Sequence, residues 1–130
     1  MPLADQDDLT GYGFSSQQSS LLGAIPQKIT GVGATVQSGA AVLISRMAEL
    51  NPSAVTANSF IIPSDARVMN PFFLVNTNAT NPAFVFVPSG HTLVATPGAT
   101  ANGSVQINAA TALVNTAIIW QYKPKNWALK

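Results

Sequence analysis

The sequence predicts an all-β protein, an antiparallel β-sandwich or small jelly-roll-like barrel with an extended N-terminal arm. Short runs of β-branched and aromatic residues alternate with clusters of Gly, Pro, Asn and Ser roughly every 8–12 residues, a spacing typical of sandwiches and small barrels. No helical pattern separates these runs, so nothing indicates a parallel βαβ sheet. The chain has 130 residues, which is the length of one domain.

Residues 1–24 predict the arm. They combine three aspartates with SSQQSS and GYG and offer little apolar surface to bury, a composition typical of segments without a packed core. This acidic start also lacks the apolar stretch of a signal peptide. Apolar side chains recur along the arm and are candidate anchors for a partner: Leu9, Tyr12, Phe14, Leu21 and Leu22.

The sandwich domain is predicted over 25–122. Its first ambiguous segment is AAVLISRMAEL (40–50), where Ala, Leu, Met and Glu favour a helix but VLIS and the short length fit a strand. We expect a strand over about 41–47, ended by Pro52 at the latest. VTANSFII (55–62) is β-branched and aromatic and predicts the next strand, closed by Pro63.

Two apolar runs flank a polar turn in the middle of the chain. Strands are predicted over 72–76 and 83–87, and NTNATNP between them predicts a turn in which Asn side chains cap the backbone. Phe84 and Phe86 lie on one face of the second strand, with Val85 and Val87 on the other. A strand that is apolar on both faces needs cover on both, so Val85 and Val87 are candidate partner-binding residues and a second subunit is the expected cover.

Three more strands complete the predicted domain. HTLVA follows the PSG turn, and SVQIN alternates with Val105 and Ile107 inward. The last strand is expected over about 112–122, with Val114, Ile118 and Trp120 on one, core-facing side. The remaining residues, 123–130, are predicted to be a basic C-terminal tail.

Charge is the unusual feature of the composition. Charged residues make up 8% of the chain against about 25% in an average soluble protein, and none lies between Val68 and Tyr122. A surface of Asn, Thr, Ser, Gln and Ala suits a protein whose faces are covered by neighbours. We therefore expect a homo-oligomer; a neutral but soluble secreted domain is the alternative.

His91 is the one histidine of the chain. A nucleophilic site would need it beside a Ser or Thr and a carboxylate. A triad with Asp65 or Glu49 stays open, although no motif supports it. One histidine in a chain poor in carboxylates and without cysteine also predicts no metal site. We expect His91 to be structural and the protein to have no catalytic residue, cofactor or metal.

Other binding classes are judged from charge and aromatic residues. Lys123, Lys125 and Lys130 interleave with Tyr122 and Trp127, but a formal net charge of +1 is far from the basic surface that nucleic acid requires. No apolar run approaches the roughly 20 residues of a membrane span. The composition thus predicts neither nucleic acid nor a membrane as partner, whereas exposed Trp and Tyr beside Asn-rich loops leave carbohydrate binding open.

Five short motifs occur in a characteristic order: ITGVGATVQSGAAVL (29–43), TANSFIIP (56–63), LVNTNATNPAFVFVPSG (74–90), GSVQI (103–107) and IIWQY (118–122). In this order and spacing the chain resembles a group of small β-sandwich structural proteins from the virions of tailed bacteriophages. The Asp-bearing arm and the end KPKNWALK depart from that pattern.

The resemblance implies a head decoration or cement protein on the capsid surface, which binds the major capsid protein and stabilises the shell, and which assembles as a trimer without a cofactor. A fibre, collar or tail-associated host-recognition module that binds carbohydrate is the alternative.

Overall fold

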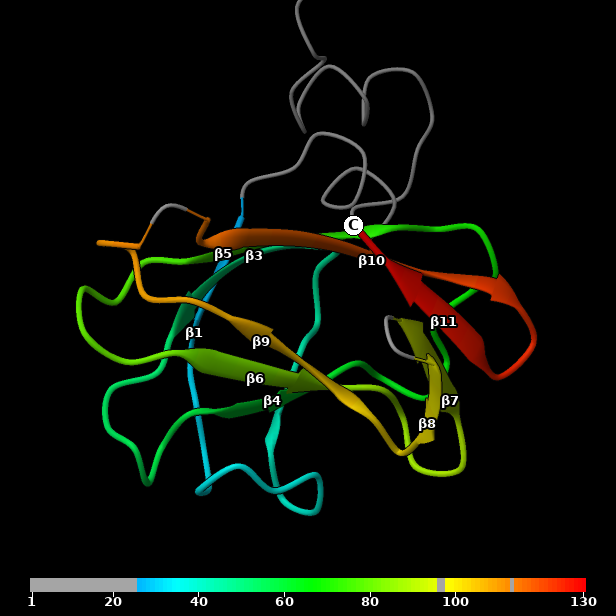
Figure 1. Ribbon diagram of the computed structural model, residues 1–130, viewed down its shortest axis with the longest axis horizontal. Coiled ribbons are helices and arrows are strands. Elements are labelled where there is room, and N and C mark those ends of the chain that lie inside the picture. Colours follow the sequence, from blue (N-terminus) through cyan, green and yellow to red (C-terminus); the bar gives the residue numbers. More distant parts are fainter. Residues whose placement is uncertain (1–25, 96–97, 113) are drawn as a thin grey trace, which may run out of the picture.

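In the computed structural model, which describes residues 26–95, 98–112 and 114–130, two β-sheets face each other and the described residues contain no helix (Figure 1). From edge to edge, the larger sheet contains β1 (Gln27–Thr30), β3 (Met47–Asn51), β5 (Phe72–Asn76), β10 (Thr116–Lys123), β11 (Asn126–Leu129), β7 (Thr92–Ala95) and β8 (Gly98–Ala101). The smaller sheet contains β2 (Ala41–Val42), β4 (Ser59–Ile61), β6 (Ala83–Phe86) and β9 (Ser104–Ile107). The all-β prediction is confirmed, and the predicted arm lies outside the described residues.

The prediction of antiparallel sheets is wrong for the first half of the domain, and also for the parallel pair β11–β7 in the second half. From β1 to β6 the chain alternates between the sheets, so β1, β3 and β5 pair in parallel in one sheet, and β2, β4 and β6 do so in the other. The parallel arrangement needs no helix because each connection contains a strand of the opposite sheet. Antiparallel pairing joins β10 to β5 and to β11, β6 to β9, and β7 to β8.

Gly31 marks the first crossing between the sheets. Its N–H donates to the Asn51 carbonyl in the larger sheet, while the next N–H, of Val32, donates to the Ser59 carbonyl in the smaller one. A Cβ at Gly31 would lie 2.5 Å from the Ala57 carbonyl oxygen. The close approach of two backbones at this crossing therefore requires glycine.

The ambiguous segment 40–50 is strand, but in two pieces. β2 belongs to the smaller sheet and β3 to the larger, and between them Leu43 is wholly buried where the chain crosses the core. The strand expected over 55–62 is shorter than predicted, as β4, because residues 54–57 form a turn closed by the Ala57 N–H on the Ala54 carbonyl. The strand predicted over 72–76 is confirmed to the residue as β5.

The core fills the space between the sheets. The larger sheet contributes side chains such as Leu50, Leu74 and Ile119, and the smaller sheet contributes Phe60 and Ile107 among others. Val85 and Val87 are also 0% exposed and belong to this core. No partner can contact these two side chains at the surface of the folded chain, so their proposed partner-binding role is wrong.

The predicted C-terminal tail is a strand of the larger sheet. β11 lies between β10 and β7, with Trp127 wholly buried beneath it. The chain reverses at Pro124 and Lys125, and Lys125 has a φ of 64°. The three lysines suggested a solvated end, but the Pro-Lys turn and one large aromatic residue are sufficient for a hairpin.

The facing of β10 also differs from the prediction. Its buried side chains are Ala117, Ile119 and Gln121, so Ile118 and Trp120 point away from the core. Both sets alternate with period two, so the pattern alone does not decide which of them faces the core. The structure satisfies the buried amide of Gln121: Nε2 donates to the Ala66 carbonyl and Oε1 accepts from the Lys125 N–H.

The polar turn between β5 and β6 is organised by Asn76, which is 0% exposed. Its Nδ2 donates to the carbonyls of Asn81 and Ile107, and its Oδ1 accepts from the Asn78 N–H. Asn78 Oδ1 then accepts from two further N–H groups of the turn. The predicted capping of the backbone by Asn side chains is confirmed, and it links the two sheets because Ile107 belongs to β9.

We expect Asn76→Ala to lower the free energy of unfolding by about 1–3 kcal/mol or more, because buried backbone groups lose their partners. Urea unfolding followed by Trp fluorescence measures the change. Gln106→Ala, at an exposed position on β9, is the matched control and should change stability by less than about 0.5 kcal/mol. Equal effects of the two substitutions would contradict the role given to Asn76.

Candidate interaction surfaces

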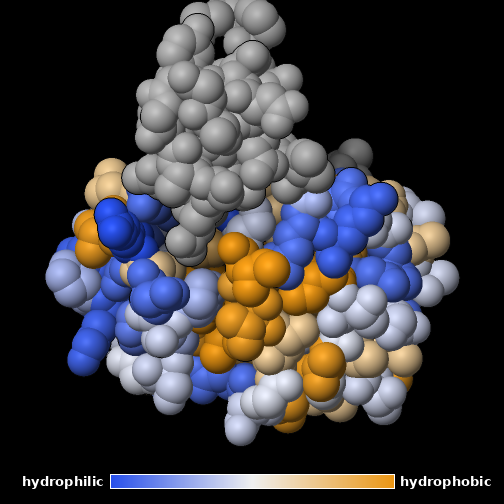
Figure 2. Space-filling view, turned by 180° about the vertical axis from the view of Figure 1, so that it is seen from behind, coloured by the Kyte–Doolittle hydropathy of each residue, from blue (hydrophilic) through white to orange (hydrophobic). Residues whose placement is uncertain are grey.

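The residues predicted to bind a partner are separated by the structure into two groups. Leu9, Tyr12, Phe14, Leu21 and Leu22 lie outside the described residues, and Val85 and Val87 are in the core. Candidate surfaces must therefore be found among other side chains. Figure 2 shows that apolar residues gather in the middle of one face of the molecule, bordered by hydrophilic ones.

One edge of the smaller sheet is formed by an interrupted strand. The Val32 N–H donates to the Ser59 carbonyl at the start of β4, and Gly33 pairs with Ala57 just before it. The chain then leaves in a loop over 34–40, and β2 pairs farther along β4. Positive φ angles at Gly33 and Gly39, 88° and 78°, let the loop leave and return.

This loop lies on the outer side of the smaller sheet. The Val36 N–H donates to Ser59 Oγ, and Gln37 Nε2 donates to the Val87 carbonyl at the end of β6. Ser59 faces outward beside Phe84 and is 0% exposed. The chain itself thus supplies part of the outer cover of the two-sided apolar strand, which the sequence suggested would come from a second subunit.

The same edge exposes an uncharged apolar surface, which we call the edge patch: Val32, Val36, Val42 and Ile44. Ile44 is 79% exposed and the three valines are 43–52% exposed. No charged residue lies between Lys28 and Arg46. The charge-free, glycine-containing run before Arg46 is the sequence signal for this surface, but only its last part was expected to be structured, as a strand over about 41–47.

The outer face of the larger sheet carries a second apolar surface, the outer band: Met47, Phe73, Ile118, Trp120, Ala128 and Val94. Phe73 alternates with the buried Phe72 and Leu74 and is 45% exposed. Tyr122 extends the outward row of β10, with the Lys123 ammonium 5.8 Å from its ring centroid. The aromatic groups expected in the core or tail are thus partly on a sheet surface.

His91 has a structural contact. It stands just before β7, and its Nδ1 accepts a hydrogen bond of 3.0 Å from the indole Nε1–H of the buried Trp127. Burial, and secondarily the charge of Lys125, lower the pKa of His91 from its ordinary value. The neutral imidazole therefore keeps Nδ1 unprotonated for Trp127, and a triad with Asp65 or Glu49 finds no support in its contacts.

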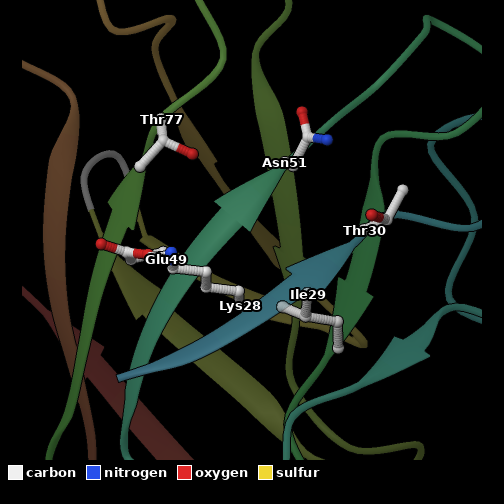
Figure 3. A pocket seen from close by; sticks show the side chains of 6 residues that line it. All are labelled: Lys28, Ile29, Thr30, Glu49, Asn51 and Thr77. Carbon is white, nitrogen blue, oxygen red and sulfur yellow. Dashed lines mark ion pairs between the residues drawn. The ribbon is translucent and has the colours of Figure 1, made fainter. Parts of the chain in front are cut away.

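A hollow of about 410 Å³ lies on the outer side of β1, β3 and the end of β5, lined by Lys28, Ile29, Thr30, Glu49, Asn51 and Thr77 (Figure 3). Lys28 Nζ and Glu49 Oε2 are 4.0 Å apart across neighbouring strands, and the lysine side chain is 85% exposed. An exposed pair of this kind contributes little to stability. The hollow offers no nucleophile with a base in hydrogen-bond reach.

Among residues 26–95, 98–112 and 114–130, no group of three His, Asp or Glu side chains is placed to hold a metal ion. No helix in that part of the chain is long and apolar enough to span a membrane. Comparison with known protein families, curated proteins and solved structures finds no match to this chain.

We expect His91→Ala to lower the free energy of unfolding by about 1–3 kcal/mol, because the buried indole N–H of Trp127 loses its acceptor. Denaturant unfolding at pH 7.5 measures the loss. In a Trp127→Phe background the donor is absent, so the same substitution should cost much less. A cost that is equal in both backgrounds would show that the hydrogen bond is unimportant.

Stability should also depend on pH through His91. The unfolded chain protonates this group near pH 6.5, whereas the folded chain does so only at lower pH. The contribution of His91 to the free energy of unfolding is complete above about pH 6.5. It is lost progressively as the pH falls toward the folded-state pKa, because in this range only the unfolded state takes up the proton. Unfolding curves between pH 5 and 8 should show this decline for the wild type and a weaker one for His91→Asn; parallel curves would count against it.

Proposed function

We propose that the protein is a non-enzymatic structural component of a tailed-bacteriophage virion, a head decoration or cement protein that associates with its own copies and with the major capsid protein. The observation that carries the proposal is the edge patch: four apolar side chains, 43–79% exposed, in a stretch without charge. The resemblance in motif order supports the virion assignment, and it rests on the sequence alone.

The edge patch is suited to association between protein surfaces. Soluble proteins usually protect a sheet edge with charged residues or proline, and here neither occurs from Gly31 to Ser45. Full burial of a Val or Ile side chain contributes about 1.5–3 kcal/mol, so burying the exposed parts of these four side chains in a contact gives a modest stabilisation. Many such contacts on one lattice reinforce one another, because a subunit that is held at one point meets the next at high effective concentration.

Self-association would place edge patches at the boundaries between subunits. A trimer is the expected assembly, and contact with the capsid protein would use the remaining uncharged surface. Because no charged side chain lies between Val68 and Tyr122, neighbours can approach these strands and turns without desolvating ions. In this way the protein would hold capsomers together without any single strong contact.

One observation favours the second candidate function, a carbohydrate-binding module of a fibre, collar or tail. Trp120 faces outward on β10 together with Tyr122, which is 37% exposed. Such a row offers aromatic faces to sugar rings. A glycan array probed with the purified protein tests this candidate separately.

We expect the wild type to form an assembly several times its 13.5 kDa monomer mass, and to be retained on capsid shells depleted of it. Ile44→Lys should shift the mass toward the monomer and reduce retention severalfold, because a charge enters the edge patch. Val55→Lys makes the same chemical change at a residue 67% exposed outside the patch and should behave as wild type. Light scattering after size exclusion and sedimentation with shells measure the two effects.

If light scattering gave only the monomer mass at micromolar concentration, self-association would be removed from the proposal. An oligomer that is not retained on shells would remove the capsid role and leave the carbohydrate-binding candidate.

A further inference from the structure

The register of five strands places the outer band in two rows. In the first row Met47, Phe73 and Ile118 lie side by side on β3, β5 and β10. In the second, Trp120, Ala128 and Val94 continue across β10, β11 and β7. The core lies on the opposite side of this sheet, so the band is a sheet face that would need a cover of its own.

Three lysines lie on the two middle strands of the band, at the two ends of the β10–β11 hairpin. Ile118 exchanges backbone hydrogen bonds with Lys130, which places that lysine beside the first row, and Lys123 and Lys125 flank the hairpin turn. Residues 26–130 contain all six basic residues and two of the five acidic ones, a formal charge of +4. Residues 1–25 contain the other three acidic residues and no basic one, a charge of −3.

We propose that residues 1–25 of the same chain lie across the outer band as its cover. Three properties of that segment match the face: it has the opposite charge, it contains apolar residues between Leu9 and Leu22, and it joins the described chain at β1, the edge strand of the same sheet. Both its negative charge and its covalent connection to β1 favour this segment as the occupant of the outer band.

Residues 1–25 are long enough to span the outer band. β7 is five strands from β1, which is about 24 Å at the usual spacing between strands. An extended chain covers this distance in about eight residues, so 25 residues reach the whole band with slack. The order along the chain is compatible with this: Leu21 and Leu22 are nearest to β1, Tyr12 and Phe14 follow, and the aspartates are farthest along the segment, with enough chain to reach the lysines of β10 and β11.

Attachment within one chain has an advantage over attachment to a neighbour. A tethered segment meets its own sheet at an effective concentration of about millimolar, so weak apolar contacts suffice. The contacts between Asp5, Asp7 or Asp8 and the lysines should weaken as salt rises, since exposed charges are screened. The apolar part of the contact should persist.

Paramagnetic NMR on the full-length protein tests the proposal. The chain has no cysteine, so Thr116→Cys creates a single position for a nitroxide label; Thr116 is exposed and faces outward on β10 next to the band. We expect severalfold greater broadening of the amide signals of residues 9–22 than with the label at Gln106→Cys, which is exposed on the outer side of the other sheet. Asp5→Asn, Asp7→Asn and Asp8→Asn together should reduce the broadening of residues 5–12.

A mixed sample identifies the source of the segment. Spin-labelled protein without ¹⁵N is combined with ¹⁵N protein without cysteine, and we expect little broadening of residues 1–25. Broadening as strong as in the single-species sample would overturn the proposal in favour of a segment from a neighbouring copy. Equal broadening from the two label positions, or none from either, would overturn it as well, because the band would then have no preferred contact with this segment.

Discussion

Every connection from β1 to β6 carries the backbone from one sheet to the other, and the rest of the structure depends on this constraint. Neighbouring strands of one sheet are never consecutive in this half of the chain, so no turn joins a pair directly. Backbone hydrogen bonds hold the two strands together, and the chain between them contains a strand of the opposite sheet. The crossings explain the wholly buried Leu43 and the glycine at position 31, where two backbones nearly touch. They also bring β1 and β2, the edge strands of the two sheets, to the same side of the molecule, where Gln27 Oε1 accepts hydrogen bonds from the Ile44 and Ser45 N–H groups.

Much of the secondary structure is predictable from the sequence, because strand residues alternate and turns carry Gly, Pro and Asn. β5 is found to the residue, and the capping role of the Asn-rich turn follows from the chemistry of its side chains. Strand direction cannot be predicted from these signals. Turn residues indicate that the chain bends, but not whether it returns to the same sheet or crosses to the other. The antiparallel expectation failed at that step.

The candidate surfaces illustrate a second limit. Where both faces of a strand are apolar, as in β6 and β10, periodicity gives two sets of residues without choosing the inner one. Val85 and Val87 were assigned to a partner and are core, whereas Trp120 was assigned to the core and faces outward. The buried amides of Asn76 and Gln121 add to the difficulty, because their hydrogen-bond partners come from distant parts of the chain and a local pattern cannot reveal them.

The crossing topology has a consequence for how the chain acquires its structure during synthesis. Hairpins form within microseconds because their strands are close in sequence, but among the described residues the consecutive strand pairs that hydrogen-bond are β7–β8 and β10–β11, both in the second half. The parallel ladders of the first half join strands separated by an entire strand of the other sheet, and such non-local pairing is slow. β5 also pairs with β10, and β10 with β11, so the larger sheet cannot be completed until residues 116–129 have left the ribosome. The first half must therefore remain in water, incompletely paired, while the second half is being made.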